Sequence, residues 1–344
     1  MHIEDFDYEL PTELIAQEPC TTRDESKLMV VNRHKKTIEH KIFKNLIDYL
    51  NPEDVLVINN TKVIPARLLG GKENTGARIE FLLLKKIDRN VWITLVKPSR
   101  KVELGTIINF DNEILKATII AKLTKGMHVV KFTCKGKFQK ILEEFGKTPL
   151  PPYIKRETEL PSDRERYQTI YSRYEGSVAA PTAGMHFSQE LLKSIQEKGV
   201  KLSTVILHVG YGTFSPIEEE KVENHKMYSE FYSLKKNARD IINTAKMNNK
   251  NIFAVGTTSA RVLETCVLDY GMVKDAEGYT DLFIYPGYEF KIVDRLITNF
   301  HLPRSTLLML VSAFAGRELI IEAYKEAIRE KYRFYSFGDA MLII

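Results

Sequence analysis

The sequence predicts an α/β body, a mixed sheet with helices, that carries an inserted all-β, barrel-like domain. Apolar, strand-like runs alternate with amphipathic helical patterns near both ends of the chain. Between them, short β-rich runs follow one another with no room for helices, which favours an antiparallel barrel or sandwich. A chain of 344 residues also exceeds the usual single-domain length. We therefore expect a body of residues 1–65 and 153–344 and an insert of residues 66–152.

The N-terminal segment is expected to form a helix, a hairpin, a second short helix and a strand, at residues 10–17, 28–40, 43–50 and 55–58. The run Val-Leu-Val-Ile at 55–58 is continuously apolar, as in strands that are buried on both faces. It ends in a polar loop, residues 59–62, at the strand's carboxyl end. Open α/β sheets place their ligands at such ends.

The insert is predicted from β-rich runs at residues 77–84, 91–96, 106–110, 114–123 and 129–134. Residues with turn chemistry separate the runs, beginning with Gly70 and Gly71. One helix, residues 138–145, follows, and prolines between residues 149 and 152 form a stiff exit.

In the C-terminal part of the chain, strand-like runs and helical patterns alternate again. Residues 156–173 are expected to form a charged loop followed by a helix. Strands are expected at 201–209, 231–234, 251–255, 282–284, 296–300 and 340–344, and helices at 189–198, 238–248, 260–268, 307–315 and on to 330.

Residues 174–187, YEGSVAAPTAGMHF, have neither a helical nor a strand rhythm and are too apolar for a solvated loop. We expect a buried or half-buried loop whose glycines let a ligand approach the main chain. It delivers His186 to a helix that Ser188 caps. A tight structural crossover would show the same composition, so both interpretations stand.

The charge of the chain is unevenly distributed, although its net value is only +5. Residues 66–150 hold 17 Lys and Arg against 8 Asp and Glu, and the remainder holds 33 against 37. The insert is therefore distinctly basic on a slightly acidic body, although the net charge is too small to argue for nucleic acid and lysines that merely solvate the outer faces of a sheet would give the same count.

The composition limits the class of protein. The longest apolar run, residues 307–315, is too short to span a bilayer, and the N-terminus lacks a signal pattern, so a cytoplasmic location is expected. Cys20, Cys134 and Cys266 form neither a disulfide framework nor a zinc motif, and we expect them to be reduced.

Four loops hold the small and polar residues that sites need, at residues 59–62, 184–188, 210–213 and 256–259. The last, Gly-Thr-Thr-Ser, lies between a strand and a helix, where backbone N–H groups suit a carboxylate or phosphate. An ordinary Thr-capped helix start is the alternative. Arg261 either faces the same anion or pairs with Glu264 on the helix surface.

Three histidines stand out by context: His186 after the small-residue loop, His208 in an apolar strand, and His301 before a proline turn. Each alone is more often a core residue than a catalyst. No spacing of ligand residues predicts a metal site, and no Gly-x-Ser-x-Gly elbow predicts acyl transfer.

Eight long segments are informative when they are taken together. They are DFDYELPTELIAQEP (5–19), VLVINNTKVIPARL (55–68), YEGSVAAPTAGMHF (174–187), LHVGYGTF (207–214), VGTTSAR (255–261), DLFIYPGYEF (281–290), TNFHLPRSTLLML (298–310) and FYSFGDAML (334–342). In this order they resemble one family, the S-adenosylmethionine:tRNA ribosyltransferase-isomerases of queuosine biosynthesis. One departure is Tyr228, where members usually carry a second histidine, so no proton-transfer role is expected for it.

The resemblance implies a fold and a reaction. The fold is an α/β body with an inserted β-barrel, in agreement with the patterns above. The reaction transfers the ribosyl moiety of S-adenosylmethionine to the 7-aminomethyl-7-deazaguanine wobble base of tRNA and isomerises it. Epoxyqueuosine forms, and adenine and methionine leave. S-adenosylmethionine is a consumed substrate, and no metal or redox cofactor is implied.

The reaction that the resemblance implies leads us to expect roles for individual residues. The candidates for the general base are His186, His208 and His301, in that order, and Arg261 or His301 would assist the departure of adenine. Residues expected to bind S-adenosylmethionine are Thr182, Gly184, Met185, Phe187, Tyr211, Gly212, Thr213, Gly256, Thr257, Thr258 and Ser259. Phe187 or Tyr211 would lie beside the sulfonium cation.

The tRNA anticodon loop is the expected macromolecular partner, bound by a monomer. Candidates for phosphate contacts are Lys97, Arg100, Lys101, Arg156, Arg164 and Arg166. Two other functions are weighed against this one. A tRNA methyltransferase would carry a glycine-rich turn after its first strand, which is missing, and a non-catalytic RNA-binding protein would not need the inward His, Thr and Gly loops.

Overall fold

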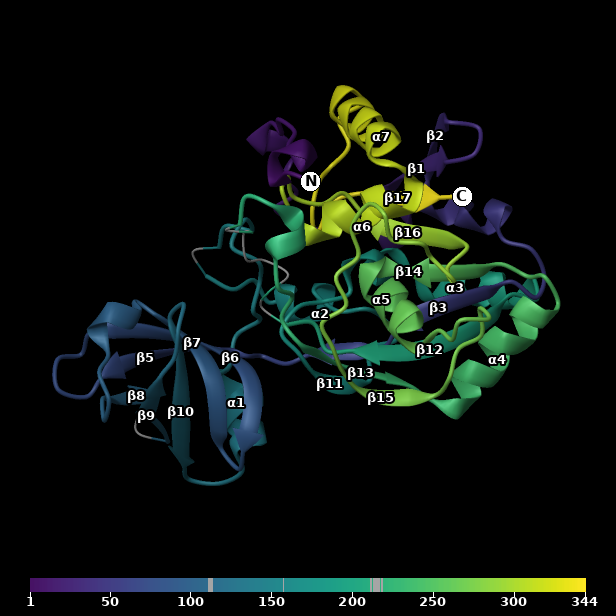
Figure 1. Cartoon of the computed structure of the whole chain (residues 1–344). Helices are drawn as coiled ribbons and strands as arrows, with labels where there is room; N and C mark the ends of the chain where they lie inside the picture. The colour runs from purple at the N-terminus through teal and green to yellow at the C-terminus, as the bar shows by residue number, and fades with distance from the viewer. Residues whose placement is uncertain (111–113, 157, 211, 213–216, 218) are drawn as a thin grey trace. The chain divides into compact units, whose positions relative to one another are not determined.

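The computed structural model describes the whole chain except residues 111–113, 157, 211, 213–216 and 218. It contains a large mixed sheet with helices and a closed antiparallel barrel, which confirms the predicted fold class (Figure 1). The chain divides into two compact units, of which one comprises Met1–Lys62, Pro151–Lys155 and Arg166–Ile344. The other comprises Val63–Leu150 and Arg156–Glu165, whereas the sequence placed the insert at 66–152.

The first unit, the body, is built on a nine-stranded sheet of order β15-β13-β12-β3-β14-β16-β17-β1-β2. The strands are β1 (Lys27–Asn32), β2 (Thr37–Ile42), β3 (Val55–Asn59), β12 (Lys201–Leu207), β13 (Glu230–Leu234), β14 (Ile252–Val255), β15 (Ala276–Thr280), β16 (Arg295–Asn299) and β17 (Ala340–Ile343). Strands β12, β3, β14 and β16 are parallel neighbours. Their carboxyl ends therefore meet at one edge of the sheet, which is where open α/β folds build sites.

Both faces of the central strands are buried. Val55 and Val57 of β3 belong to one apolar cluster, and Leu56 and Ile58 belong to the other. This explains the continuous apolar run, since alternate side chains of a strand point to opposite faces. The first cluster includes residues of α4 (Lys236–Met247), α5 (Gly256–Cys266), α6 (Thr306–Ala315) and α7 (Arg317–Arg329), and the second includes α3 (Gln189–Glu197) and the 3-10 helix Phe43–Tyr49.

The second unit contains a closed six-stranded barrel of order β10-β7-β6-β5-β8-β9. The strands are β5 (Arg67–Lys72), β6 (Arg78–Asp88), β7 (Val91–Lys97), β8 (Ile107–Phe110), β9 (Leu115–Lys122) and β10 (Met127–Cys134), followed by α1 (Phe138–Phe145). Helix α2 (Asp163–Arg166) also lies in this unit except for Arg166, which belongs to the body. Phe81, Phe110 and Phe132 fill its interior, with ring centroids 5.4 to 6.4 Å apart. Closure removes the exposed edges that an open sheet would present.

Several local expectations are wrong. Residues 10–17 form only the 3-10 turn Thr12–Leu14 instead of a helix. Gly70 and Gly71 lie inside β5 and not in a turn; a Cβ on Gly70 would collide with Ile108 and Phe110, so glycine allows the strands to pack. The strand expected at 282–284 is replaced by β15, whose sequence Ala-Glu-Gly-Tyr-Thr has no apolar run because it is an edge strand.

The segment 174–187 is more regular than expected. Tyr174–Ser177 forms β11, which pairs with β4 (Thr61–Val63), and Thr182–His186 forms a 3-10 helix. Ser188 caps α3 as predicted, because its hydroxyl accepts from Leu191 N at 3.0 Å. The supposed loop 256–259 is the first turn of α5. Among the described residues, no helix combines the length and apolar character that a membrane crossing requires.

Candidate active site

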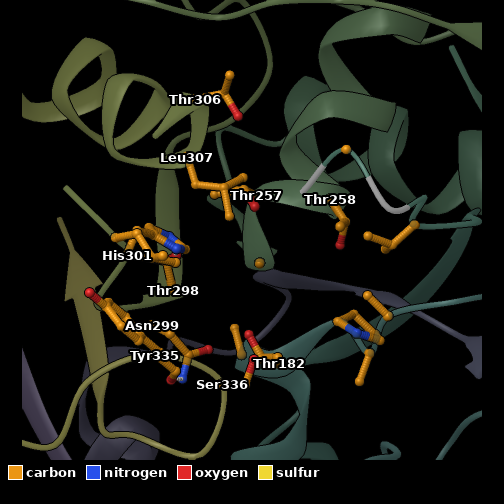
Figure 2. A pocket seen from close by; sticks show the side chains of 18 of the residues that line it. Thr182, Thr257, Thr258, Thr298, Asn299, His301, Thr306, Leu307, Tyr335 and Ser336 are labelled. Carbon is orange, nitrogen blue, oxygen red and sulfur yellow. Dashed lines mark hydrogen bonds between the residues drawn. The ribbon is translucent and has the colours of Figure 1, made fainter. Parts of the chain in front are cut away.

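A cavity lies at the carboxyl edge of the parallel strands of the body. Segments far apart in the sequence line it, at residues 179–183, 225–230, 256–261, 298–302 and 335–336 (Figure 2). The space between these residues, including the part that is open to solvent, is about 960 Å³. The fold thus brings several turns to one site.

The predicted S-adenosylmethionine-binding residues divide into three groups. Thr182, Gly212, Gly256, Thr257 and Thr258 line the cavity. Gly184, Met185, Phe187 and Ser259 do not line it, and Tyr211 and Thr213 lie outside the described residues.

Three of the four residues that do not reach the cavity, Gly184, Phe187 and Ser259, make contacts within the fold instead. Phe187 is fully buried and packs edge-on against Phe43. A Cβ on Gly184 would overlap the Tyr171 hydroxyl. The Ser259 hydroxyl donates to the O atom of Val255, the last residue of β14, at 2.8 Å.

Arg261 lines the cavity from the second turn of α5. Its guanidinium forms a buried ion pair with Glu230, and both side chains are 6% exposed. Glu230 also accepts from Gly210 N at 2.7 Å, and Arg261 Nε donates to Leu282 O at 3.1 Å. The pair with Glu264, one of the two alternatives for Arg261, does not form; that carboxylate instead accepts from backbone N–H groups of residues 291–293. Arg261 is thus held in place by groups on other segments of the body.

Three polar atoms in the cavity wall are buried yet have no hydrogen-bond partner within the described part of the chain. They are Arg261 Nη2, Thr258 Oγ1 and Asn299 Oδ1. Buried polar atoms are nearly always paired in folded proteins, so an unpaired set around one cavity indicates a ligand site. The set offers a cationic donor, a hydroxyl and an acceptor.

Asn299 has a fixed orientation. Its amide nitrogen donates to His186 Nε2 at 3.1 Å and to Tyr335 O at 3.2 Å. Both are acceptors in this arrangement, which leaves Oδ1 free to face a ligand.

His186 lies outside the cavity with both ring nitrogens engaged. Nδ1 lies 2.7 Å from Ser26 Oγ, and the ring stacks on Phe43 with centroids 5.0 Å apart. Burial, with a smaller effect of Arg333 and Arg23, lowers the pKa of His186 to about 3. The ring therefore stays neutral and orients Asn299.

His301 lines the cavity and is also buried. Its Nε2 lies 2.7 Å from Thr298 Oγ1, and its backbone N–H donates to the Tyr324 hydroxyl at 2.9 Å. Burial lowers the pKa of His301 to about 3. A neutral imidazole of this kind is a hydrogen-bonding group rather than a strong base.

His208 does not line the cavity. Its Nδ1 lies 2.8 Å from Thr61 Oγ1, and its ring stacks on Phe231 with centroids 5.3 Å apart. Burial lowers the pKa of His208 as well. Of the three histidines chosen from the sequence, only His301 reaches the cavity.

A fourth histidine, His225, also lines the cavity. Its Nδ1 lies 3.2 Å from Glu219 Oε2, and its ring packs edge-on against Phe283. Among the described residues no group is hydrogen bonded to Nε2. A histidine that donates from one nitrogen to a carboxylate and keeps the other free has the arrangement of a general base. Sequence reasoning missed it because it lies in a charged segment without periodicity.

The buried state of His186 predicts a pH-dependent stability. The unfolded-state pKa is about 6.5, above the folded value, so the unfolded chain binds the extra proton. The contribution of neutral His186 to the free energy of unfolding is therefore fully present above about pH 6.5. It falls by about 1.4 kcal/mol per pH unit as the pH falls from there towards the folded pKa.

Urea unfolding at several pH values between about 5 and 6.5 measures this effect. The His186→Gln variant should show a smaller slope than the wild type, by about 1 kcal/mol per pH unit. The pKa values of Glu264 and Asp339 are raised by burial and act in the opposite sense, but they are common to both proteins and cancel in the comparison. If the free energies of unfolding of the wild type and the variant changed equally with pH, this would contradict the buried neutral state of His186.

The candidate tRNA-binding residues are differently placed. Lys97 ends β7, and Arg100 and Lys101 lie in the 3-10 turn Ser99–Lys101 of the barrel unit. Arg156 is tied to buried Asp163 at 3.2 Å, and Arg164 donates to Glu143 O at 2.7 Å. Arg166, in the body, donates to Thr21 O at 3.1 Å and to Cys20 O. Arg156, Arg164 and Arg166 thus also make an ion pair or hydrogen bonds to backbone oxygens within their own units.

The chain is similar in sequence to proteins of one family. It matches the family described as "Queuosine biosynthesis protein" over residues 3–343. The S-adenosylmethionine:tRNA ribosyltransferase-isomerase of Desulforamulus reducens is 53% identical over 344 residues, and that of Acetivibrio thermocellus is 55% identical over 343, each with 100% coverage of both chains. The solved S-adenosylmethionine tRNA ribosyltransferase of Thermotoga maritima is 42% identical, covers 99% of this chain and 100% of its own, and has a TM-score of 0.56.

Proposed function

The chain belongs to the family of queuosine biosynthesis proteins, and we propose that the cavity of its body is where the family's reaction takes place. The enzyme transfers the ribosyl moiety of S-adenosylmethionine to the 7-aminomethyl-7-deazaguanine wobble base of tRNA and isomerises it to epoxyqueuosine, releasing adenine and methionine. The observation that carries the site assignment is the set of unpaired polar atoms of Arg261, Thr258 and Asn299 around one cavity.

The methionine end of the substrate is assigned to Arg261 and the first turn of α5. Its carboxylate would accept from Arg261 Nη2 and from N–H groups at the helix start, where the helix dipole favours an anion. Gly256 has φ +85°, a conformation that favours glycine and lets the chain turn directly from β14 into the helix. The Thr258 hydroxyl lies on the same turn and completes the anion site.

The adenine end is assigned to Asn299 and His301, which Figure 2 shows on the side of the cavity away from Thr258. Asn299 Oδ1 would accept from the exocyclic amino group. With Thr298 donating to Nε2, neutral His301 carries its proton on Nδ1 and can donate it as a hydrogen bond to a ring nitrogen of adenine. Such a bond stabilises the negative charge that develops on departing adenine.

His225 is assigned as the general base, with Glu219 as the positioning residue. The sulfonium acidifies the neighbouring C–H bonds, so a neutral imidazole can remove that proton, and the Glu219 carboxylate stabilises the resulting imidazolium. Adenine then leaves, the amine of the tRNA base attacks, and methionine departs as the epoxide closes. The sulfonium supplies the leaving group, so we propose that no metal or redox cofactor takes part.

Tyr228 is the aromatic residue placed to face the sulfonium. It lines the cavity, and a Cβ on Gly212 would overlap its ring, so glycine at 212 lets the ring lie against the backbone. An aromatic face attracts a fixed cation. This role replaces the one proposed for Phe187, which is fully buried away from the cavity.

The assay that tests the function measures the products of S-adenosylmethionine with tRNA that carries the modified base. Release of adenine and methionine is expected. S-adenosylhomocysteine would instead identify a methyltransferase, and no turnover would identify a non-catalytic RNA-binding protein.

The barrel is proposed to bind the tRNA through Lys97, Arg100 and Lys101. Reversing these charges should weaken tRNA binding and reduce the slope of its salt dependence by about one for each phosphate that is no longer neutralised, with S-adenosylmethionine affinity unchanged. Lys193→Glu on α3, at a side chain that is 77% exposed, is the matched control. Unaltered tRNA binding by the triple variant would show that this turn faces elsewhere.

We further propose that the enzyme acts as a monomer on the anticodon loop in the cytoplasm. The cavity is built by one chain, and tRNA and S-adenosylmethionine are both available in that compartment.

A further inference from the structure

A row of aromatic rings crosses one face of the body's sheet at its β15 end. His208 N donates to Phe231 O at 2.9 Å, and Phe231 of β13 is paired in register with Tyr279 of β15. Residues directly opposite on neighbouring strands point to the same face. The rings follow one another, with centroids 5.3 Å and 5.8 Å apart.

This aromatic row is accessible. Tyr279 is 57% exposed, and Phe231 and His208 are half-buried. The opposite face at the same place is closed, because Tyr232 and Leu207 belong to the apolar cluster that includes α4 and α5. A row of one exposed and two half-buried rings is not needed to stabilise a sheet that already has one packed face, so the row indicates a binding surface.

Two cations lie against a fourth ring beside the row. Lys235 Nζ lies 5.1 Å from the ring centroid of Tyr174, and the Arg173 guanidinium lies 5.6 Å from it. Tyr174 O also accepts from Thr61 Oγ1, the hydroxyl that contacts His208. The acidic groups nearby are Glu175, paired with Lys62 at 3.0 Å, and exposed Glu277.

We propose that this platform, made of Tyr174, His208, Phe231 and Tyr279 with Arg173 and Lys235, binds unpaired nucleotides of the substrate RNA by base stacking. Rings take up bases irrespective of sequence, and the two cations are complementary to backbone phosphates. The inference rests on the proposed function for its partner, an RNA with a single-stranded loop.

The position of the platform relative to the cavity supports a role in presenting the target base. Glu230 lines the cavity, and Phe231, the next residue of β13, points to the opposite face of the sheet, so the platform lies across this strand from the cavity wall. Nucleotides stacked on the row would hold the RNA loop open at the strand that carries Glu230 and lower the cost of unstacking the base that enters the cavity.

Binding of a fluorescent anticodon stem-loop that carries the modified base tests the platform. Tyr279→Ala and Phe231→Ala should each weaken binding by between about fivefold and a hundredfold, the range for removal of one base–aromatic stack. Phe231→Tyr should retain wild-type affinity. Tyr270→Ala, which removes a ring 75% exposed outside the platform, is the matched control.

The outcomes separate the two proposals. Weakened stem-loop binding in both alanine variants, with unchanged S-adenosylmethionine affinity and unchanged binding of a fully paired RNA duplex, supports the platform. Wild-type affinity in both variants overturns it while the enzyme still releases adenine. A wild-type protein that neither binds the stem-loop nor releases adenine overturns the platform and the proposed function together.

Discussion

Exchange of His225 for glutamine is expected to lower kcat for adenine release by about 100-fold or more, the usual loss when a general base is removed. The KM for S-adenosylmethionine should change little, because the proton is transferred only in the transition state. The structural reason is the Nδ1 contact with Glu219 at 3.2 Å, which leaves Nε2 to accept a proton in the cavity.

A second variant makes this prediction specific. Glu219→Gln keeps the hydrogen bond but removes the charge that stabilises the imidazolium, so it should lower kcat less than His225→Gln does. Activity of His225→Gln within about threefold of wild type would remove His225 from the base role.

Removal of the Arg261 side chain is expected to have the second large effect. Arg261→Met should raise the dissociation constant of S-adenosylmethionine by about 30-fold or more, since truncating one partner of a buried charge pair costs about 2–5 kcal/mol. It should also lower the free energy of unfolding by about 3 kcal/mol or more, because Glu230 would remain buried without its cation.

A double variant separates binding from stability. Arg261→Met with Glu230→Gln removes both buried charges, so stability should largely recover while S-adenosylmethionine binding stays weak. Arg304→Met, which removes an exposed ion pair with Asp7, is the control. If binding recovers together with stability, Arg261 only supports the fold.

The sequence predicted the fold where local pattern and burial agree. The continuous apolar run of β3 reflects burial on two faces. The turn-separated runs of the barrel reflect burial on one face. Elements without such a signal were missed. Edge strand β15 is held by its backbone pairing with β13 rather than by its own apolar residues. Strand β5 contains Gly70 because residues of β8 pack closely against that position.

The candidate site was predicted only in part for a similar reason. Small-residue turns at strand ends mark a site locally, so Thr182 and Gly256–Thr258 were found. The ion pair of Arg261 joins residues 31 positions apart, and His225 becomes meaningful only beside Glu219 within the folded cavity. His186 shows the converse: its local context suggested a catalyst, but tertiary packing engages both ring nitrogens.

A crystal structure of the protein with S-adenosylmethionine bound tests the central claim most directly. The account predicts the methionine carboxylate on Arg261 and the first turn of α5, adenine against Asn299 and His301, and the carbon beside sulfur about 3–3.5 Å from His225 Nε2. A ligand bound in the reverse orientation, or one that leaves Arg261 Nη2 and Asn299 Oδ1 unpaired, would contradict it.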